Sequence, residues 1–427
     1  MTKMTKMTKF NSLIAALILQ LPAHAVYGQQ PCDKTPEESL QQAAVILNEQ
    51  KSKDLWNVTL NAPLIIIDHI ENKMYFTAIE DGEVQPFREE EWNNKVTLAN
   101  SFSEYEGKRY VTIIHAALAN ATCEQRINIL AHEIFHLHQN SLGIENTMSA
   151  NYHIDEVEGR ALLQIEMKAL QQALDGNLSG LFDALCVRAY RQSLYPDNNE
   201  DLYELNEGLA EYTGAKLSGA NMKEYAKARL TYDIKRGYAN AFAYFTGSSY
   251  ACILDQLYPT WRYDKDLSKG MTYLIKKVRP EYAVAIDDAH LRKLLGGYDY
   301  DGILSGEREE LKSFGNIAAF EDLIKPGTAK LRIINRGNFN LSYNPNDRII
   351  TLSDGATLLR NITIMAELGE IKVTSGIVRP NDWSTLYLLP PQKIEGNLIK
   401  GDDYEIRLNQ GWRMIEKDGL HEIVKES

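Results

Sequence analysis

The sequence predicts an α+β protein in which a mainly helical domain with a small sheet is followed by a small all-β domain. Apolar residues recur at spacings of three and four through much of residues 30–325, which is the pattern of helices packed on a core. Residues 326–427 change to short alternating runs separated by Asn-Pro, Asp-Gly and Gly-Asp turns, which is typical of strands. The change at Lys325-Pro326-Gly327 sets the predicted boundary between the two domains.

The first 29 residues have the pattern of an export leader. Three lysines precede an apolar stretch at 10–21, and Ala23-His24-Ala25 then satisfies the small-x-small rule for cleavage. We therefore expect a signal peptide at 1–29 and a secreted or periplasmic mature protein. The apolar stretch is too short to cross a bilayer, so the protein is not expected to span a membrane.

Charge and cysteine content narrow the class of protein. The formal net charge of −12 disfavours nucleic acid as a partner, because binding phosphates requires a basic surface. An oxidising compartment would permit two disulfide bridges with three possible pairings. The cysteines are widely spaced and form no C-x-x-C pair of the kind that binds structural zinc: Cys32, Cys123, Cys186 and Cys252.

The mature chain is expected to begin with a helix at 36–48 and a hairpin at 63–78 that turns at 71–73. A strand at 109–118 follows, because Val111, Ile113 and Ile114 give it β-branched character. This strand either supports the helix that follows it or pairs with an extended peptide. In the C-terminal domain, strands are expected at 331–334, 349–352, 371–375 and 404–408.

The segment His132-Glu133-Ile134-Phe135-His136 predicts a metal site. Thr122 and Gln125 have the form of a capping box, so a helix is expected from 123 to 140. On a helix, His132 and His136 share one face and both rings can reach one cation. Glu133 points away from the shared position and is placed to take a proton from water at the metal. His138 falls on another face and is not expected to bind the metal.

Catalytic zinc usually has three protein ligands, so a third one must come from elsewhere. Glu156 and Glu158 lie in the first turn of a helix expected at 155–174, where acidic residues commonly complement the helix dipole. Glu207 lies on a second helix with small residues, Gly208 and Ala210, that would let it pack tightly against the His132 helix. Glu211, one turn later, could accept the second ring N–H of a ligating histidine.

His132-Glu133-x-x-His136 followed by Asn206-Glu207-Gly208-Leu209-Ala210-Glu211-Tyr212 resembles the gluzincin metallopeptidases, which include thermolysin-like proteases and membrane-alanyl-type aminopeptidases. The resemblance implies a zincin-like catalytic domain at 30–325, with Glu207 as the third zinc ligand and Glu211 behind the ligands. Glu207 follows His136 by 71 residues, which is longer than is usual in that group. Glu156 and Glu158 therefore remain alternative third ligands.

Hydrolases of this group usually use a tyrosine or histidine to stabilise the oxyanion. Tyr250 and Tyr244 are the candidates, from the segment 242–255, in which a helix is expected to start near Gly247; Tyr212 is a further candidate. The sequence thus predicts a zinc-dependent peptidase-like hydrolase that acts on peptide or protein substrates with Glu133 as general base. Two alternatives remain open: a non-catalytic, zinc-containing binding protein of the cell envelope, and a metallohydrolase that acts on a non-peptide amide or ester.

Overall fold

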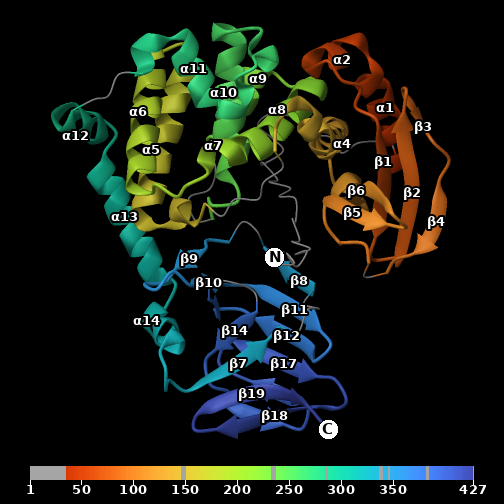
Figure 1. Ribbon diagram of the computed structural model, residues 1–427, viewed down its shortest axis with the longest axis vertical. Coiled ribbons are helices and arrows are strands. Elements are labelled where there is room, and N and C mark those ends of the chain that lie inside the picture. The colour runs from red at the N-terminus through yellow and green to blue at the C-terminus, as the bar shows by residue number, and fades with distance from the viewer. Residues whose placement is uncertain are drawn as a thin grey trace, which may run out of the picture. The chain divides into compact units, whose positions relative to one another are not determined.

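The computed structural model describes residues 35–93, 95–145, 151–231, 237–283, 287–335, 340–344, 347–380 and 384–426 (Figure 1). The predicted leader at 1–29 lies outside these residues. A helical region is followed by C-terminal sheets, so the predicted α+β class is confirmed. The chain forms two compact units: Met1–Gly143 with Thr213–Ala220, and Ile144–Tyr212 with Asn221–Ser427.

The first unit combines short helices with a mixed sheet. Its helices are α1 (Pro36–Asn48), α2 (Gln50–Trp56), α3 (His115–Ala119) and α4 (Cys123–His138). Its strands are β1 (Ala62–Asp68), β2 (Lys73–Glu80), β3 (Glu83–Val84), β4 (Arg88–Glu91), β5 (Ser101–Tyr105) and β6 (Lys108–Ile114). The predicted helix at 36–48 and the predicted hairpin are confirmed, and Asn72 takes the left-handed conformation in the turn (φ 54°).

The sheet of the first unit has the order β3-β2-β1-β6-β5, and β4 also pairs with β2. The predicted strand at 109–118 ends at Ile114, because the chain turns into α3 at His115. Strand β6 pairs with β1 in parallel and with β5 in antiparallel fashion. Both of its edges are therefore occupied, which excludes β6 itself as the strand that adds an extended peptide and leaves β5 at the sheet edge.

The second unit begins with a group of helices. They are α5 (Val157–Leu174), α6 (Leu178–Leu194), α7 (Glu200–Tyr203), the π-helical turn η3 (Glu204–Gly208), α8 (Leu209–Leu217), whose last residues belong to the first unit, α9 (Met222–Arg229), α10 (Phe242–Leu257), α11 (Met271–Val278), α12 (Asp288–Gly297), α13 (Tyr300–Ser313) and α14 (Ile317–Glu321). Leu162 and Ile165 of α5 are buried with Val187 of α6. This packing orients the buried ionic side chains described below.

Two antiparallel-rich sheets complete the second unit. One has the order β18-β19-β7-β14-β13-β10-β9 and the other β15-β16-β17-β12-β11-β8. Alternate residues of both sheets, such as Leu331, Ile364 and Ile406, bury their side chains in one core, as in a β-sandwich. The strands are β7 (Lys330–Ile334), β8 (Asn340–Tyr343), β9 (Ile350–Thr351), β10 (Thr357–Leu359), β11 (Ile362–Ala366), β12 (Gly369–Val373), β13 (Ile377–Arg379), β14 (Thr385–Leu388), β15 (Lys393–Glu395), β16 (Leu398–Lys400), β17 (Tyr404–Leu408), β18 (Trp412–Lys417) and β19 (Leu420–Lys425).

Buried polar contacts join the sandwich to the helices of the same unit. The Asp155 carboxylate accepts hydrogen bonds from the backbone N–H groups of Tyr238 (2.6 Å) and Ile349 (3.1 Å) and from Arg160 (3.1 Å). Arg348 donates from Nε to the Asp155 carbonyl oxygen at 3.0 Å. The chain changes from helices to strands near the predicted boundary at residue 325, but residues on both sides of this boundary belong to one compact unit.

Two further expectations concern membranes and disulfides. Within the described ranges, no helix is both long enough and apolar enough to cross a membrane. Cys123 is disulfide-bonded, whereas Cys186 and Cys252 are buried thiols. The two bridges that the sequence permits therefore do not both form, because Cys186 and Cys252 are thiols.

Candidate metal centre

Helix α4 presents the three residues of the predicted motif in a buried position. The capping box predicted for its start is present: Thr122 Oγ1 accepts from the Gln125 backbone N–H, and the Gln125 side chain accepts from the Thr122 backbone N–H. His132, Glu133 and His136 are 5%, 4% and 7% exposed. Burial of imidazole and carboxylate groups costs free energy of folding unless they are paired or bind a metal. We therefore expect these three side chains to have polar partners or a metal ion.

The two histidines face one another through their Nε2 atoms, which are 3.2 Å apart. Two nitrogen ligands of a tetrahedral zinc ion, each at about 2.0–2.1 Å, would be about 3.3–3.4 Å apart. The other ring nitrogen of His136, Nδ1, lies 2.8 Å from Gln139 Oε1. The amide oxygen can accept only if Nδ1 carries the proton, which leaves Nε2 of His136 as the lone-pair nitrogen.

Glu207 completes a buried group with these histidines. One ligand atom from each of His132, His136 and Glu207 lies within 4.8 Å of the others. Two imidazoles and one carboxylate are a donor set of the kind found at catalytic zinc sites, which keep a further position for water or substrate. The residues therefore fit a bound metal ion, and the predicted metal-binding group is present in the structure.

The packing of α8 on α4 within the first unit accounts for the reach of Glu207. A Cβ on Gly214 of α8 would lie 2.6 Å from the backbone oxygen of Asn128 on α4, so only glycine allows this approach. Trp56 Nε1 also donates to Thr213 Oγ1 at 2.9 Å. At 1.5 Å per residue, Glu207 lies about 10 Å before Gly214 along the helix, and His132 and His136 lie about 6 and 12 Å beyond Asn128. These lengths are similar on the two segments, and one ligand atom from each of Glu207, His132 and His136 lies within 4.8 Å of the others.

Glu207 itself lies in the π-helical turn η3 rather than in a regular helix. The backbone N–H of Leu209 donates to the carbonyl of Glu204, five residues earlier. Such π turns occur mostly as single turns within α-helices and are frequent at functional sites; the extra residue shifts the side chains around the axis. Arg188 and Thr246 hold the Glu204 carboxylate at the start of this turn.

Gly208 faces α10, and this corrects the expectation that it serves packing against the His132 helix. A Cβ on Gly208 would lie 2.7 Å from the carbonyl oxygen of Ala243 and 2.8 Å from the Cα of Gly247. A Cβ on Gly247 would in turn lie 2.7 Å from the Cα of Gly208. The two backbones meet at this pair of glycines, next to the predicted ligand Glu207.

We expect Gly208→Ala to destabilise the protein, because the obstructing atoms belong to the backbone of α10 and must move. The cost of such overpacking is about 1–3 kcal/mol, which exceeds the gain of about 1 kcal/mol in helix propensity. Gly306 of α13 is a matched control, since a Cβ there would meet nothing within 4 Å. Calorimetry should therefore find a lower Tm for Gly208→Ala and an unchanged or higher one for Gly306→Ala. An equal rise in both variants would contradict the close approach.

The three candidate tyrosines lie in different surroundings. Tyr244 donates from its hydroxyl to Glu207 Oε2 at 2.6 Å. Tyr250 is fully buried and donates to Glu166 Oε1 at 2.6 Å. Tyr212 donates to Asp255 at 2.8 Å. The structure therefore brings Tyr244 to the predicted ligand, and it gives the hydroxyl of Tyr250, our first candidate, a partner in another buried cluster. Helix α10 starts at Phe242 and not near Gly247, so Tyr244 lies on the same helix as Tyr250.

The alternative ligands and the neighbouring histidine are engaged elsewhere. Glu158 accepts from the Tyr300 hydroxyl at 3.0 Å. Glu156 is the N-cap residue of α5 without a side-chain cap hydrogen bond, and burial together with the charge of Glu156 raises the pKa of Tyr195. His138, expected to bind nothing, instead donates to the carbonyl oxygen of Asn61 at 3.0 Å. Among the described residues, none of these three belongs to a group that could hold a metal ion.

Glu211 lies one turn after Glu207 and is held by α9. Its Oε1 accepts from the Tyr225 hydroxyl and from Arg229 Nη2, and all three side chains are buried. Burial works against the charge of Arg229, but Glu211 raises the pKa of Arg229 above its ordinary value. Sequence reasoning identified Glu211 but not its partners on α9, nor Gln139. The position of Gln139, three residues after His136, was a signal for the latter.

A second buried cluster lies around α6 in the second unit. Arg188 donates to Glu166 Oε1 and to Glu204 Oε2, each at 2.8 Å. Arg191 donates to Glu166 Oε2 and to Glu200 Oε2, each at 2.6 Å. Three carboxylates thus meet two guanidinium groups. Burial raises the pKa of Glu204 to about 7, with smaller contributions from the charges of Asp201 and Glu166, although Arg188 opposes the shift.

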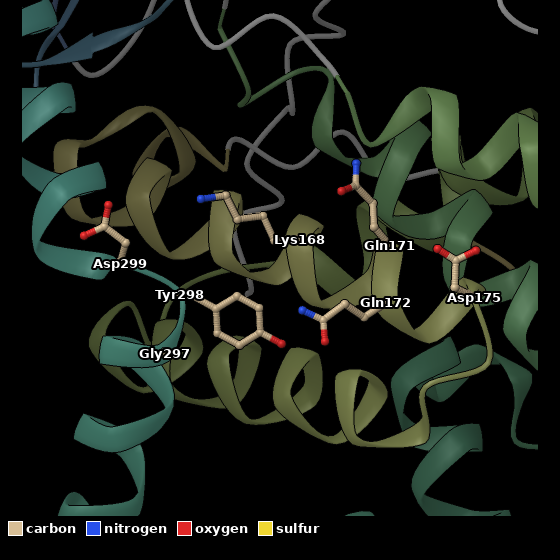
Figure 2. A pocket seen from close by; sticks show the side chains of 7 residues that line it. All are labelled: Lys168, Gln171, Gln172, Asp175, Gly297, Tyr298 and Asp299. Carbon is tan, nitrogen blue, oxygen red and sulfur yellow. The ribbon is translucent and has the colours of Figure 1, made fainter.

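A shallow pocket of about 510 Å³ lies away from the predicted site residues. Figure 2 shows that its lining comes from one face of α5 and from the junction of α12 and α13. Lys168, Gln172 and Asp175 are exposed, and Asp175 forms ion pairs with Lys223 and Lys227. Among the residues that line this pocket, none is a buried polar group that would indicate a ligand. We therefore assign the pocket no role.

Comparison of the chain with family models, with curated proteins and with solved structures found no match.

Proposed function

We propose that this protein is an exported, zinc-dependent, peptidase-like hydrolase in which His132, His136 and Glu207 hold the metal ion. The observation that carries the proposal is the buried grouping of two imidazoles and one carboxylate, with Glu133 on the same helix between the two histidines. A purely structural zinc site would have four protein ligands and no need of a nearby general base. Export is proposed from the leader pattern at 1–29.

When bound, zinc lowers the pKa of a water molecule towards 7 and polarises the carbonyl of a substrate. Glu133 then serves as general base: its carboxylate accepts a proton from water and delivers that proton to the leaving amine. Gln139 keeps Nε2 of His136 as the lone-pair nitrogen through its contact with Nδ1. The Tyr244 hydroxyl and the π turn hold Glu207 in place.

The test is the zinc content of the purified mature protein and of three variants, measured by mass spectrometry after dialysis against zinc-free buffer. We expect one zinc ion per chain in the parent and its loss in Glu207→Ala, because two histidines alone bind zinc weakly. Glu156→Ala and Glu158→Ala are the matched controls, since each removes the carboxylate of one alternative ligand. Both variants should retain one zinc ion per chain. Loss of zinc in either control, or a parent without zinc, would contradict the proposed ligand set.

A positive result justifies a substrate screen, which separates peptides from other amides and esters. New amino termini released from a mixture of synthetic peptides would identify peptidase activity. Turnover of non-peptide amides or esters alone would assign the same water-activating chemistry to another substrate class.

A further inference from the structure

Helix α10 offers a row of hydroxyl groups to three buried glutamates of the second unit. Tyr244 donates to Glu207, Thr246 donates to Glu204, and Tyr250 donates to Glu166. Both tyrosines are almost fully buried, at 3% and 0% exposure. The three contacts are chemically alike, but Glu207 is the acceptor that belongs to the candidate metal group.

The glycine contact sets which tyrosine reaches Glu207. At about 100° per residue, Tyr244 and Tyr250 lie about 60° to either side of Gly247 around α10. Gly247 touches Gly208, the residue next to Glu207. Tyr244 is three residues before Gly247 and lies on one side of this crossing, while Tyr250 lies on the other side and meets Glu166 of α5.

We propose that Tyr244 is a positioning residue that fixes Glu207 as a ligand through a single oxygen. The proposal rests on the proposed function above. Tyr244 occupies Oε2 of the carboxylate at 2.6 Å, and we assign the metal to Oε1. A carboxylate held in this way binds in a monodentate manner, which keeps a coordination position for water. Without the hydroxyl, Oε2 loses this donor, and both oxygens of the carboxylate can then bind the metal.

The test uses Co²⁺ and Zn²⁺ alone as probes, on the full mature chain stripped of metal. We expect Tyr244→Phe to weaken metal binding 10–100-fold, which is typical of losing a partner behind a ligand. We also expect weaker visible absorption of the Co²⁺ form, because added coordination by the second carboxylate oxygen lowers the intensity of four-coordinate Co²⁺. Tyr250→Phe is the matched control: it removes the same group from the same helix and should leave affinity and spectrum within about threefold of the parent.

Folding is checked by circular dichroism of each metal-free variant. Tyr244→Met, which also keeps an apolar side chain without the hydroxyl, is used if Tyr244→Phe does not fold. Parent-like metal affinity and spectrum in the Tyr244 variant would overturn the inference, even if hydrolysis were lost, because the hydroxyl would then act on substrate. A parent that binds neither Co²⁺ nor Zn²⁺ would overturn the proposed function itself, so the two failures are distinguishable.

Discussion

Glu133→Gln is expected to lose hydrolytic activity while it keeps the fold and the metal. Glutamine has nearly the same shape as glutamate, and Glu133 lies outside the group of metal-binding atoms, so neither packing nor the ligand set changes. The amide cannot accept and return a proton at neutral pH. Because a positioned general base contributes 10²–10⁴-fold to a rate, we expect a loss of about that size in kcat. The measurement is the release of new amino termini from a peptide mixture, beside zinc content.

Helix α4 supplies its own control for this experiment. Glu124 lies in the first turn of α4 and is exposed. Glu124→Gln makes the same chemical change on the same helix, away from the metal-binding residues, and should retain parent activity. Full hydrolysis by Glu133→Gln would rule out the proposed mechanism, whereas equal losses in both variants would indicate a general effect on α4.

The parts of the site that the sequence predicted depend on local patterns. The capping box at Thr122, the two histidines one turn apart and the helical spacing that follows all lie within about twenty residues, so local rules suffice to place them. Helix α1 likewise spans the predicted residues, Pro36–Asn48. Such segments are set by contacts between near neighbours in the sequence.

The parts that could not be predicted depend on partners distant in the sequence. The sequence pattern predicts one regular helix at 205–212, whereas the structure has the π turn η3 at Glu204–Gly208. In this turn, Glu204 is bound to Arg188 from α6. The choice of Tyr244 over Tyr250 depends on the rotation of α10 about its axis. That rotation is set by the contact of Gly247 with Gly208, and it cannot be read from either helix alone.

Arg188→Met is expected to destabilise the second unit by about 3–5 kcal/mol, because it leaves the buried Glu204 carboxyl without its cation and leaves Glu166 with Arg191 alone. Arg188 is 1% exposed and binds both Glu166 and Glu204. Urea unfolding followed by circular dichroism measures the loss. Lys312→Met is the control, since Lys312 pairs with Glu309 at 2.6 Å on the surface, with side chains 71% and 68% exposed, and such pairs contribute about 0–1 kcal/mol.

A double variant separates the missing charge pair from a general packing defect. Glu204→Gln added to Arg188→Met removes the buried carboxyl that has lost its cation, so the double variant should be more stable than the sum of the two single losses predicts. Additive losses would mean that the arginine stabilises the fold through its packing. Arg188 binds Glu204, which is the first residue of the π turn that carries Glu207. A measured coupling would therefore link this charge pair to the position of Glu207. Zinc affinity should then fall with Arg188→Met and stay at the parent value with Lys312→Met.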